Sequence, residues 1–192
     1  MRHPACNVPP FAEASGESGP PEASSAMLFQ TERLSVRRFT LGDAPFVLRL
    51  LNEPLWHQHI GDRGLRTLED AQTYLTTRLL AHYEAHGFGS YCVELRDTGE
   101  PMGLTGLIQR EGLDAPDLGY AILGAHHGRG YATEAALATL THARTDLGLD
   151  RVVAFIDADN VASRRVLEKV GMRPAGTYTA EGEHEPCLLY EI

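Results

Sequence analysis

One stretch decides the predicted fold, and it consists of His127-Gly128-Arg129-Gly130-Tyr131-Ala132-Thr133-Glu134. It follows a strand-like run over 118–123 and precedes an alanine-rich helical pattern over 132–147. Two glycines in a strand-to-helix turn let the backbone fold tightly and leave its N–H groups uncovered. The next helix brings the positive end of its dipole to the same place. Anions bind such turns, so the stretch predicts an anion site with phosphate as its expected ligand.

The composition limits the classes of partner. With 192 residues, of which 43% are hydrophobic, the chain is long enough for one domain with a sizeable core, which we place at 27–192. The net charge of −9 supplies no basic field, so we expect neither a nucleic-acid partner nor a membrane partner. No apolar run approaches the length of a membrane span. A phosphate-rich ligand would therefore need local positive charge.

The segment 1–26 differs in composition from the rest of the chain. It contains five Pro, two Gly and four Ser, with hardly any large apolar residue. Such a segment cannot bury enough surface to offset its ordering entropy, so we expect a disordered leader. Two alternatives are that Met27 is the biological start and that the leader is an interaction tail.

The cysteines and the N-terminus bear on the compartment. Cys6, Cys92 and Cys187 are odd in number and unevenly spaced, so they predict neither a disulfide framework nor a metal site. Arg2 is not followed by an apolar segment, so the N-terminus does not resemble a signal peptide. We expect a cytoplasmic protein that needs no metal.

The first half of the chain predicts a strand, two helices and a hairpin. Residues 33–39 alternate apolar and polar as a half-buried strand does. Residues 40–43 have capping-box spacing before a short helix over 46–51, which 52–54 should end. After an irregular stretch at 56–59, a helix is expected from Thr67 to about Tyr83, ended by Gly87. Strands over 90–95 and 102–109 should form a hairpin through the turn at 97–100.

The second half alternates strands and helices. A strand over 117–123 leads into the glycine stretch and its helix, and 151–156 is apolar enough for a central strand. Asn160 caps a helix that Gly171 ends, and strands over 176–179 and 187–192 follow. The order is β-α-α-β-β-β-α-β-α-β-β. The hairpin implies antiparallel pairing, and the two strand–helix–strand passages near the C-terminus imply parallel pairing there. We expect an α/β protein, with a central mixed β-sheet covered by helices on both faces.

Two stretches resemble the signatures of the GCN5-related N-acetyltransferases, the GNAT family. Residues 127–135 are similar to the acetyl-CoA loop, usually written Q/R-x-x-G-x-G/A, and 160–172 are similar to the second signature helix. Element order agrees from about residue 28 to the C-terminus. Within the family, the likeness is to the branch of the ribosomal-protein N-terminal acetyltransferases. The absence of a Gly-Lys-Ser/Thr sequence argues against a P-loop nucleotidase.

The resemblance implies where acetyl-CoA binds. Its pyrophosphate would lie on backbone N–H groups of the glycine stretch, and its pantetheine arm would lie in a splay between the strands at 117–123 and 151–156. Asn160 would reach the pantetheine amides, while Arg129 and Arg165 would supply local positive charge. The expected cofactor-binding residues are Leu123, His127, Gly128, Arg129, Gly130, Tyr131, Ala132, Thr133, Asn160 and Arg165.

Two positions depart from the family pattern. His127 stands at the Q/R position, and Leu167 stands where many relatives carry the tyrosine that protonates the departing thiolate. In the ribosomal-protein-like branch a serine one turn earlier is the candidate for that role, and Ser163 matches it. The alternative for Ser163 is a small residue in a first helical turn. Glu134 matches a family glutamate, although a helix-dipole partner is the simpler interpretation.

The acceptor amine must lose a proton before it attacks, because alkylamines have a pKa of about 10. Asp117 and Tyr120 are candidate catalytic groups on the strand beside the thioester. The alternatives are a solvated, inert Asp117 at a strand start and a core position for Tyr120.

Three residues are candidates for acceptor binding. Trp56 and His57, with His59 beside them, precede the second helix, where relatives place the acceptor pocket. Glu183 belongs to an acidic run at 181–185 that could attract a cationic amine. The alternatives are surface histidines without a role and a solvated hairpin loop.

The expected function is transfer of an acetyl group from acetyl-CoA to a primary amine within a ternary complex. The acceptor would be a protein N-terminus or a small molecule, and the protein a monomer or homodimer. A protein that binds acyl-CoA without turnover, as a sensor, is the alternative that Leu167 motivates.

Overall fold

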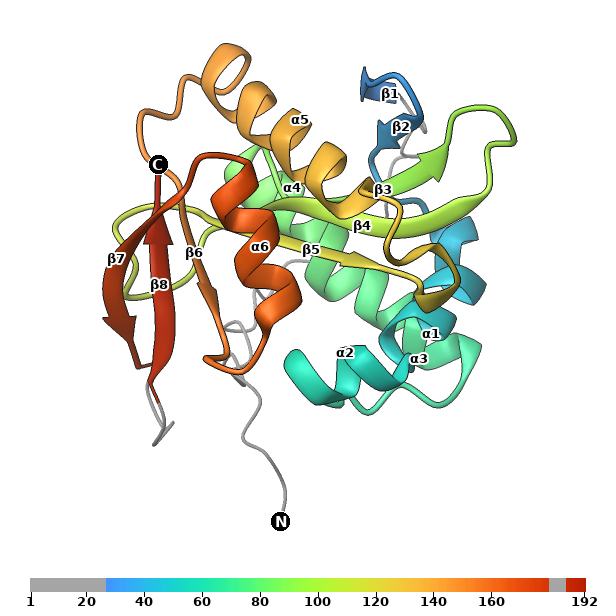
Figure 1. The fold of residues 1–192 in the computed structure, drawn as a ribbon. Coiled ribbons are helices and arrows are strands. Elements are labelled where there is room, and N and C mark those ends of the chain that lie inside the picture. The colour runs from blue at the N-terminus through green and yellow to red at the C-terminus, as the bar shows by residue number, and fades with distance from the viewer. Residues whose placement is uncertain (1–26, 180–185) are drawn as a thin grey trace.

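A computed structural model describes residues 27–179 and 186–192. The expected leader at 1–26 and the acidic run with Glu183 lie outside these residues. The described chain forms an eight-stranded mixed sheet in the order β1-β2-β3-β4-β5-β6-β8-β7 (Figure 1). None of the helices in the described ranges has the length and apolarity of a membrane span.

The first elements differ from the expectation at two points. β2 (Leu34–Arg37) confirms the first strand, but an additional strand, β1 (Met27–Gln30), pairs with it. After α1 (Ala44–Leu51), the stretch expected to be irregular forms a short helix, α2 (Pro54–His59). Pro54 begins this helix instead of ending the previous one, because its fixed φ suits a first helical position and Glu53 before it is extended.

The long second helix is confirmed, with a change of winding in its middle. It consists of α3 (Leu68–Tyr74), a π-helical segment η2 (Leu75–Leu80) and α4 (Ala81–His86). A capping box begins α3, since the Asp70 N–H donates to Thr67 Oγ1 at 3.1 Å and the Thr67 N–H donates to Asp70 Oδ2 at 2.8 Å. Gly87 ends the helix with a φ of 78°.

Three antiparallel strands and two crossovers complete the sheet. β3 (Ser90–Leu95) and β4 (Pro101–Ile108) pair antiparallel as predicted, and β5 (Asp117–Ile122) is also antiparallel to β4. α5 (Tyr131–Thr145) then crosses to β6 (Val153–Ile156), which is parallel to β5. α6 (Val161–Lys169) leads to the closing hairpin of β7 (Arg173–Tyr178) and β8 (Cys187–Glu191).

The second expected parallel pairing is wrong. β8 lies between β6 and β7 and is antiparallel to both, so the β6–α6–β7 passage skips one position in the sheet. The apolar strand β8, with Leu188 opposite Ile156, occupies the place beside β6. The mostly exposed β7 is left at the edge.

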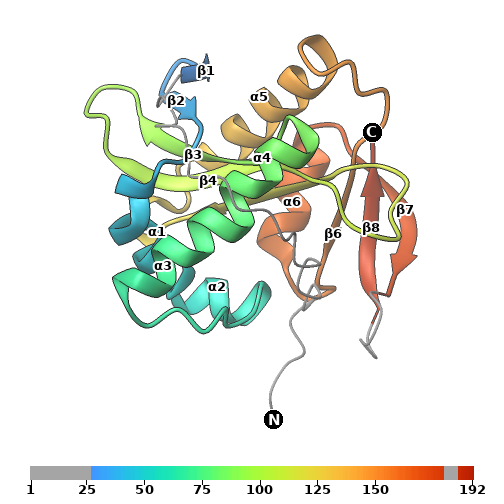
Figure 2. The same cartoon turned by 180° about the vertical axis from the view of Figure 1, so that it is seen from behind.

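Helices cover both faces of the sheet, as predicted. α5 and α6 lie on one face, and α1, α3 and α4 lie on the other (Figures 1 and 2). Leu107, Leu140 and Leu167 belong to the core beneath α5 and α6. Leu50 and Leu75 belong to the core on the opposite face. Each face of the central strands is therefore buried against its own helical layer.

Gly106 marks the tightest packing within the sheet. A Cβ on this β4 residue would collide with the carbonyl oxygen of Gly89 and lie 2.5 Å from Ser90 Cα. We expect Gly106→Ala to lower the free energy of unfolding by about 2–3 kcal/mol, because backbone atoms of β3 must move. Gly119→Ala is the matched control, since its Cβ would meet Ile108 Cδ1 at an ordinary 3.6 Å. Urea unfolding measures both variants, and equal stability of the two would contradict the packing argument.

Candidate active site

A cavity of about 920 Å³ crosses the sheet between the two helical layers. Its walls come from the glycine stretch, β5, β6, α6, α2 and the α3–η2 helix. It opens because β5 and β6 pair at one position only, Asp117 with Val153, where the Val153 N–H donates to the Pro116 carbonyl at 3.0 Å. Beyond this point the two strands have no further paired residues. The expected splay is therefore present in the geometry.

The glycine stretch has the geometry of an anion cradle. Gly128 and Gly130 have φ values of 73° and 81°, which favour glycine, and Gly130 is the N-cap of α5. Within the described residues, the N–H groups of 128–133 have no hydrogen-bond acceptor, whereas the next one, on Glu134, donates to the Gly130 carbonyl. No atom lies within 4 Å of where a Cβ of Gly128 would be. A phosphate group fits this set of open donors.

Arg33 holds the glycine stretch in place, and the sequence did not indicate it. Its guanidinium donates to the Arg129 carbonyl at 3.0 Å and to the Glu134 carboxylate at 2.7 Å, and it stacks over the Tyr131 ring at 4.5 Å. The interacting residues are about a hundred positions apart in the chain, so no local pattern reveals the contact.

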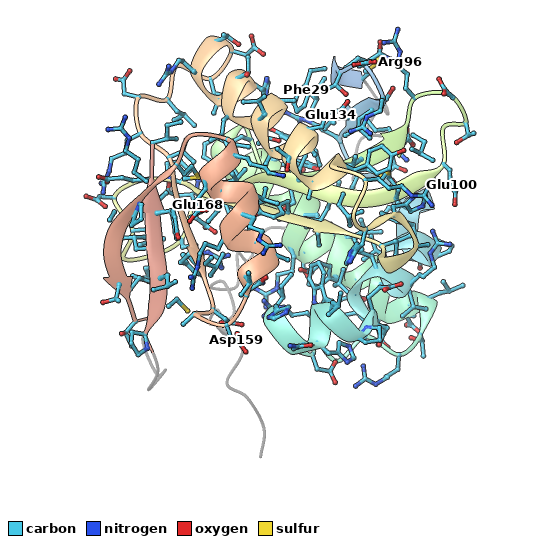
Figure 3. All side chains as sticks on the ribbon, viewed as in Figure 1. Phe29, Arg96, Glu100, Glu134, Asp159 and Glu168 are labelled. Atoms are coloured by element: carbon cyan, nitrogen blue, oxygen red, sulfur yellow. The ribbon has the colours of Figure 1, made fainter. Side chains whose placement is uncertain are left out.

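Glu134 joins α5 to the β1–β2 hairpin, as Figure 3 shows. Thr31 Oγ1 donates to its carboxylate at 2.6 Å, and the Arg33 N–H donates at 3.0 Å. Burial works to raise the pKa of Glu134, but hydrogen bonds from Thr31 and Arg33 outweigh it and lower that pKa. Glu134 therefore fixes the first turn of α5 in addition to opposing the helix dipole.

His127 and Leu123 use their polar groups within the protein. The His127 ring bonds through Nε2 to the Ile122 carbonyl at 2.7 Å, so Nε2 carries the proton. The Leu123 N–H donates to the Met102 carbonyl at 2.8 Å, and Leu123 is not among the residues that line the cavity. Arg129 does not line it either. His127 lines the cavity, and so do Asn160 and Arg165 of the expected cofactor set.

Tyr120 and Ser163, two of the candidate catalytic residues, lie in contact. The Tyr120 hydroxyl lies 2.7 Å from Ser163 Oγ and 3.1 Å from the Ser163 carbonyl oxygen. Asn160 Oδ1 accepts the Ser163 N–H at 3.0 Å and so fixes the first turn of α6. Burial raises the pKa of Tyr120 to about 12, against the opposing effect of the Ser163 hydrogen bond. The phenol is thus protonated near neutral pH and suits a donor role more than a base role.

Asp117 lies on the other face of β5, because side chains three positions apart in a strand point in opposite directions. It is 3% exposed, and Arg110 donates to its two carboxylate oxygens at 2.6 and 3.2 Å. The expectation of a solvated Asp117 is therefore wrong. Burial raises its pKa, and the charge of Arg110 opposes this rise. The ion pair holds the carboxylate, so Asp117 is not free to take a proton from the amine.

Two of the expected residues on α2 line the cavity, and a third lies outside it. Trp56 and His59 line the cavity, and His59 Nδ1 lies 3.5 Å from Asp157 Oδ2. His57 does not line it and instead faces Asp62, with 3.8 Å between Nε2 and the carboxylate. The short helix explains this difference, because residues two positions apart lie on different sides of a helix.

Comparison with known proteins identifies the family. The sequence model of the acetyltransferase (GNAT) domain family matches residues 33–173. The chain belongs to the GNAT acetyltransferases. An uncharacterized N-acetyltransferase of Bacillus subtilis (strain 168), YoaA, is 28% identical over 152 residues, which cover 78% of this chain and 84% of that protein.

Solved structures share the fold of this acetyltransferase. The acetyltransferase from Agrobacterium tumefaciens str. C58 is 26% identical with a TM-score of 0.73, and the match covers 94% of this chain and 98% of that one. RimL, a ribosomal L7/L12 alpha-N-protein acetyltransferase solved with coenzyme A, has a TM-score of 0.74 at 17% identity, over 87% and 97% of the two chains. GNAT enzymes take the acetyl group from acetyl-CoA, which is therefore the donor here.

Within the GNAT family, Leu167 is the clearest departure of this chain. Its side chain is fully buried in the core beneath α6. The position where many relatives carry a catalytic tyrosine is thus filled by apolar packing. Ser163, one helical turn earlier, lines the cavity and keeps a hydroxyl there.

A charge placed in the glycine stretch should abolish coenzyme A binding. We expect Gly130→Glu to weaken binding about 100-fold or more, because the carboxylate would oppose the pyrophosphate. Gly148→Glu is the matched control, since Gly148 also has a positive φ, of 65°, but follows the other end of α5. Calorimetric titration with coenzyme A measures the difference. Equal affinity of the two variants would show that the glycine stretch does not bind the cofactor.

Proposed function

We propose that this GNAT enzyme acetylates a primary amine by direct attack on acetyl-CoA within a ternary complex. The observation that carries the proposal is the cavity that crosses the sheet through the β5–β6 splay. The open N–H groups of 128–133 lie at one end, and the α2 wall with Trp56 and His59 contributes another part of the lining. Donor and acceptor can therefore enter from different sides and meet at β5.

The cofactor contacts follow from this arrangement. The N–H groups of 128–133 bind the pyrophosphate, with Arg165 and Lys169 of α6 supplying positive charge at the cavity wall. Lys169 was not anticipated from the sequence. The side-chain oxygen Oδ1 of Asn160 accepts the Ser163 N–H as a helix cap. The side-chain NH₂ group is left to donate to the pantetheine arm.

The backbone of β5 provides the group that stabilises negative charge on the thioester oxygen. The Pro116 carbonyl points toward β6, and backbone groups alternate sides along a strand. The N–H groups of Leu118 and Tyr120 therefore point toward β6; that of Leu118 lies at the one paired position, and that of Tyr120 faces the open splay. We assign the Tyr120 N–H as the donor to the oxygen as charge develops during attack.

We assign Ser163 and Tyr120 to the protonation of the departing thiolate. As the amine nitrogen bonds to the carbonyl carbon, the C–S bond breaks, and the thiolate takes a proton. Ser163 Oγ donates this proton to the thiolate and takes a proton from the Tyr120 hydroxyl, which lies 2.7 Å away. Solvent then reprotonates Tyr120. On the acceptor side, we assign His59, held near Asp157, as the group that removes the amine proton.

The test of this function is thiol release from acetyl-CoA with a broad panel of primary amines. The panel includes polyamines, aminoglycosides, amino acids and short peptides with free N-termini. Release that depends on enzyme and on one class of amine supports the proposal. Tight binding of coenzyme A without release for any acceptor would favour the sensor alternative.

Variants of the Tyr120–Ser163 pair test the proton pathway. We expect Ser163→Ala to lower kcat about 100-fold, because a positioned general acid contributes on this scale, and Tyr120→Phe to lower it less. Ser163→Thr keeps a hydroxyl and should retain activity. The double variant Tyr120→Phe with Ser163→Ala should be no slower than Ser163→Ala alone, because the two groups act as a unit. Steady-state kinetics at saturating acetyl-CoA measures all four, and wild-type kcat in Ser163→Ala would remove Ser163 from the mechanism.

A further inference from the structure

Arg63 is a positive charge at the cavity wall that has no ion-pair partner among the described residues. It lies in the loop between α2 and α3, and its Nε atom is buried without a hydrogen bond. Within the described residues it forms no ion pair. Burial lowers its pKa, and although Tyr74 acts to raise it, the charges of Arg110 and Arg78 lower it further. A guanidinium in such surroundings gains much from an anion.

The carboxylates of the cavity do not serve Arg63, because each is already engaged. Four carboxylate side chains line the cavity among the described residues. Asp117 pairs with Arg110 and Asp62 with Arg66, Asp157 lies 3.5 Å from His59 Nδ1, and Glu53 accepts the Gly124 N–H at 3.3 Å. Since no carboxylate of the described residues pairs with Arg63, we expect its anion to come from a ligand.

Arg63 lies away from the anion cradle of the glycine stretch. Arg110 and Asp117 lie at the start of β5, and the glycine stretch follows the end of this strand. A strand of six residues spans roughly 17 Å at about 3.3 Å per residue. Asp117, Tyr74 and Arg78 belong to the side of the sheet covered by α1 and α3. The charge of Arg63 therefore acts on the acceptor and not on the pyrophosphate of the cofactor.

We propose that the acceptor is a small-molecule amine that also carries an anionic group, a carboxylate or a phosphate, and that Arg63 binds this group. The inference rests on the proposed acetyl transfer and names its substrate class. A guanidinium binds either oxyanion through two parallel N–H donors, which fixes orientation as well as position. Arg78 adds positive charge to the same wall. Purely cationic amines, such as polyamines, meet like charge there and are disfavoured.

The first experiment compares matched acceptors by thiol release from acetyl-CoA. One arm pairs each α-amino acid with the amine that has the same side chain but no carboxylate, such as phenylalanine with 2-phenylethylamine. The other arm pairs O-phosphoethanolamine with ethanolamine. We expect kcat/KM to be at least about 30-fold higher for the anionic member in one arm, and the arm identifies the group. Equal or faster turnover of the uncharged-tail amines would overturn the proposal while leaving acetyl transfer intact.

The second experiment removes the charge of Arg63. We expect Arg63→Gln to lower kcat/KM for the preferred anionic amine about 30-fold or more and to leave its matched partner amine nearly unchanged. Arg144→Gln is the control, because Arg144 is exposed on α5 and does not line the cavity. Equal losses for both members of a pair, or equal losses in the two variants, would exclude a specific contact.

A binding measurement covers the case without turnover. The N-acetylated form of each preferred-class amine, such as N-acetylphenylalanine or N-acetyl-O-phosphoethanolamine, is titrated calorimetrically into enzyme saturated with coenzyme A. Binding that Arg63→Gln weakens and Arg144→Gln preserves supports the anion contact even if acetyl transfer is not detected. Absence of binding by every anionic product, with coenzyme A bound normally, would overturn it.

Discussion

The rest of the site depends on the early end of pairing between β5 and β6. Only Asp117 and Val153 are paired, although both strands continue. Backbone groups in the middle of a sheet are costly when they have no partner, so the splay must be satisfied by water or by a ligand. An extended arm with amide groups can add to β5 as a further strand would. In the proposed complex the cofactor would complete the sheet and bring its thioester to the residues that line the gap.

The anion cradle of the glycine stretch depends on contacts with residues that are distant in the chain. Arg33 fixes the Arg129 carbonyl and the Glu134 carboxylate, so the polar groups of the turn that could compete for its N–H donors are already engaged. The His127 ring closes the turn onto the Ile122 carbonyl. The N–H groups of 128–133 are therefore preorganised, and binding an anion there requires little rearrangement. Arg33 lies in the turn after β1, which explains why a strand at the far edge of the sheet matters to the site.

Features set by neighbouring residues could be predicted from the sequence, and features set by distant contacts could not. The helix start at Thr67, the stop at Gly87 and the turn at Gly128 and Gly130 each depend on a few adjacent residues, and each was found in place. The order of β6, β8 and β7 depends on which strand buries more apolar surface beside β6, and local patterns do not encode that. The burial of Asp117 was missed for the same reason, since Arg110 reaches it across a loop. The expectation for Glu183 stays a prediction, outside the described residues.

The two faces of β5 divide the chemistry of the enzyme. Tyr120 and Ser163 lie toward α6, where we propose that the thiol end of the cofactor binds. Asp117, Arg110 and Arg63 lie on the opposite side, where charges predominate. A strand separates its neighbours in this way at no cost, because alternate side chains point in opposite directions. The donor side is constrained by one cofactor, whereas the acceptor side is free to carry whichever charges a particular amine requires. Among the described residues, that side carries Arg63 without a carboxylate partner, so we expect the loop between α2 and α3 to set the choice of acceptor.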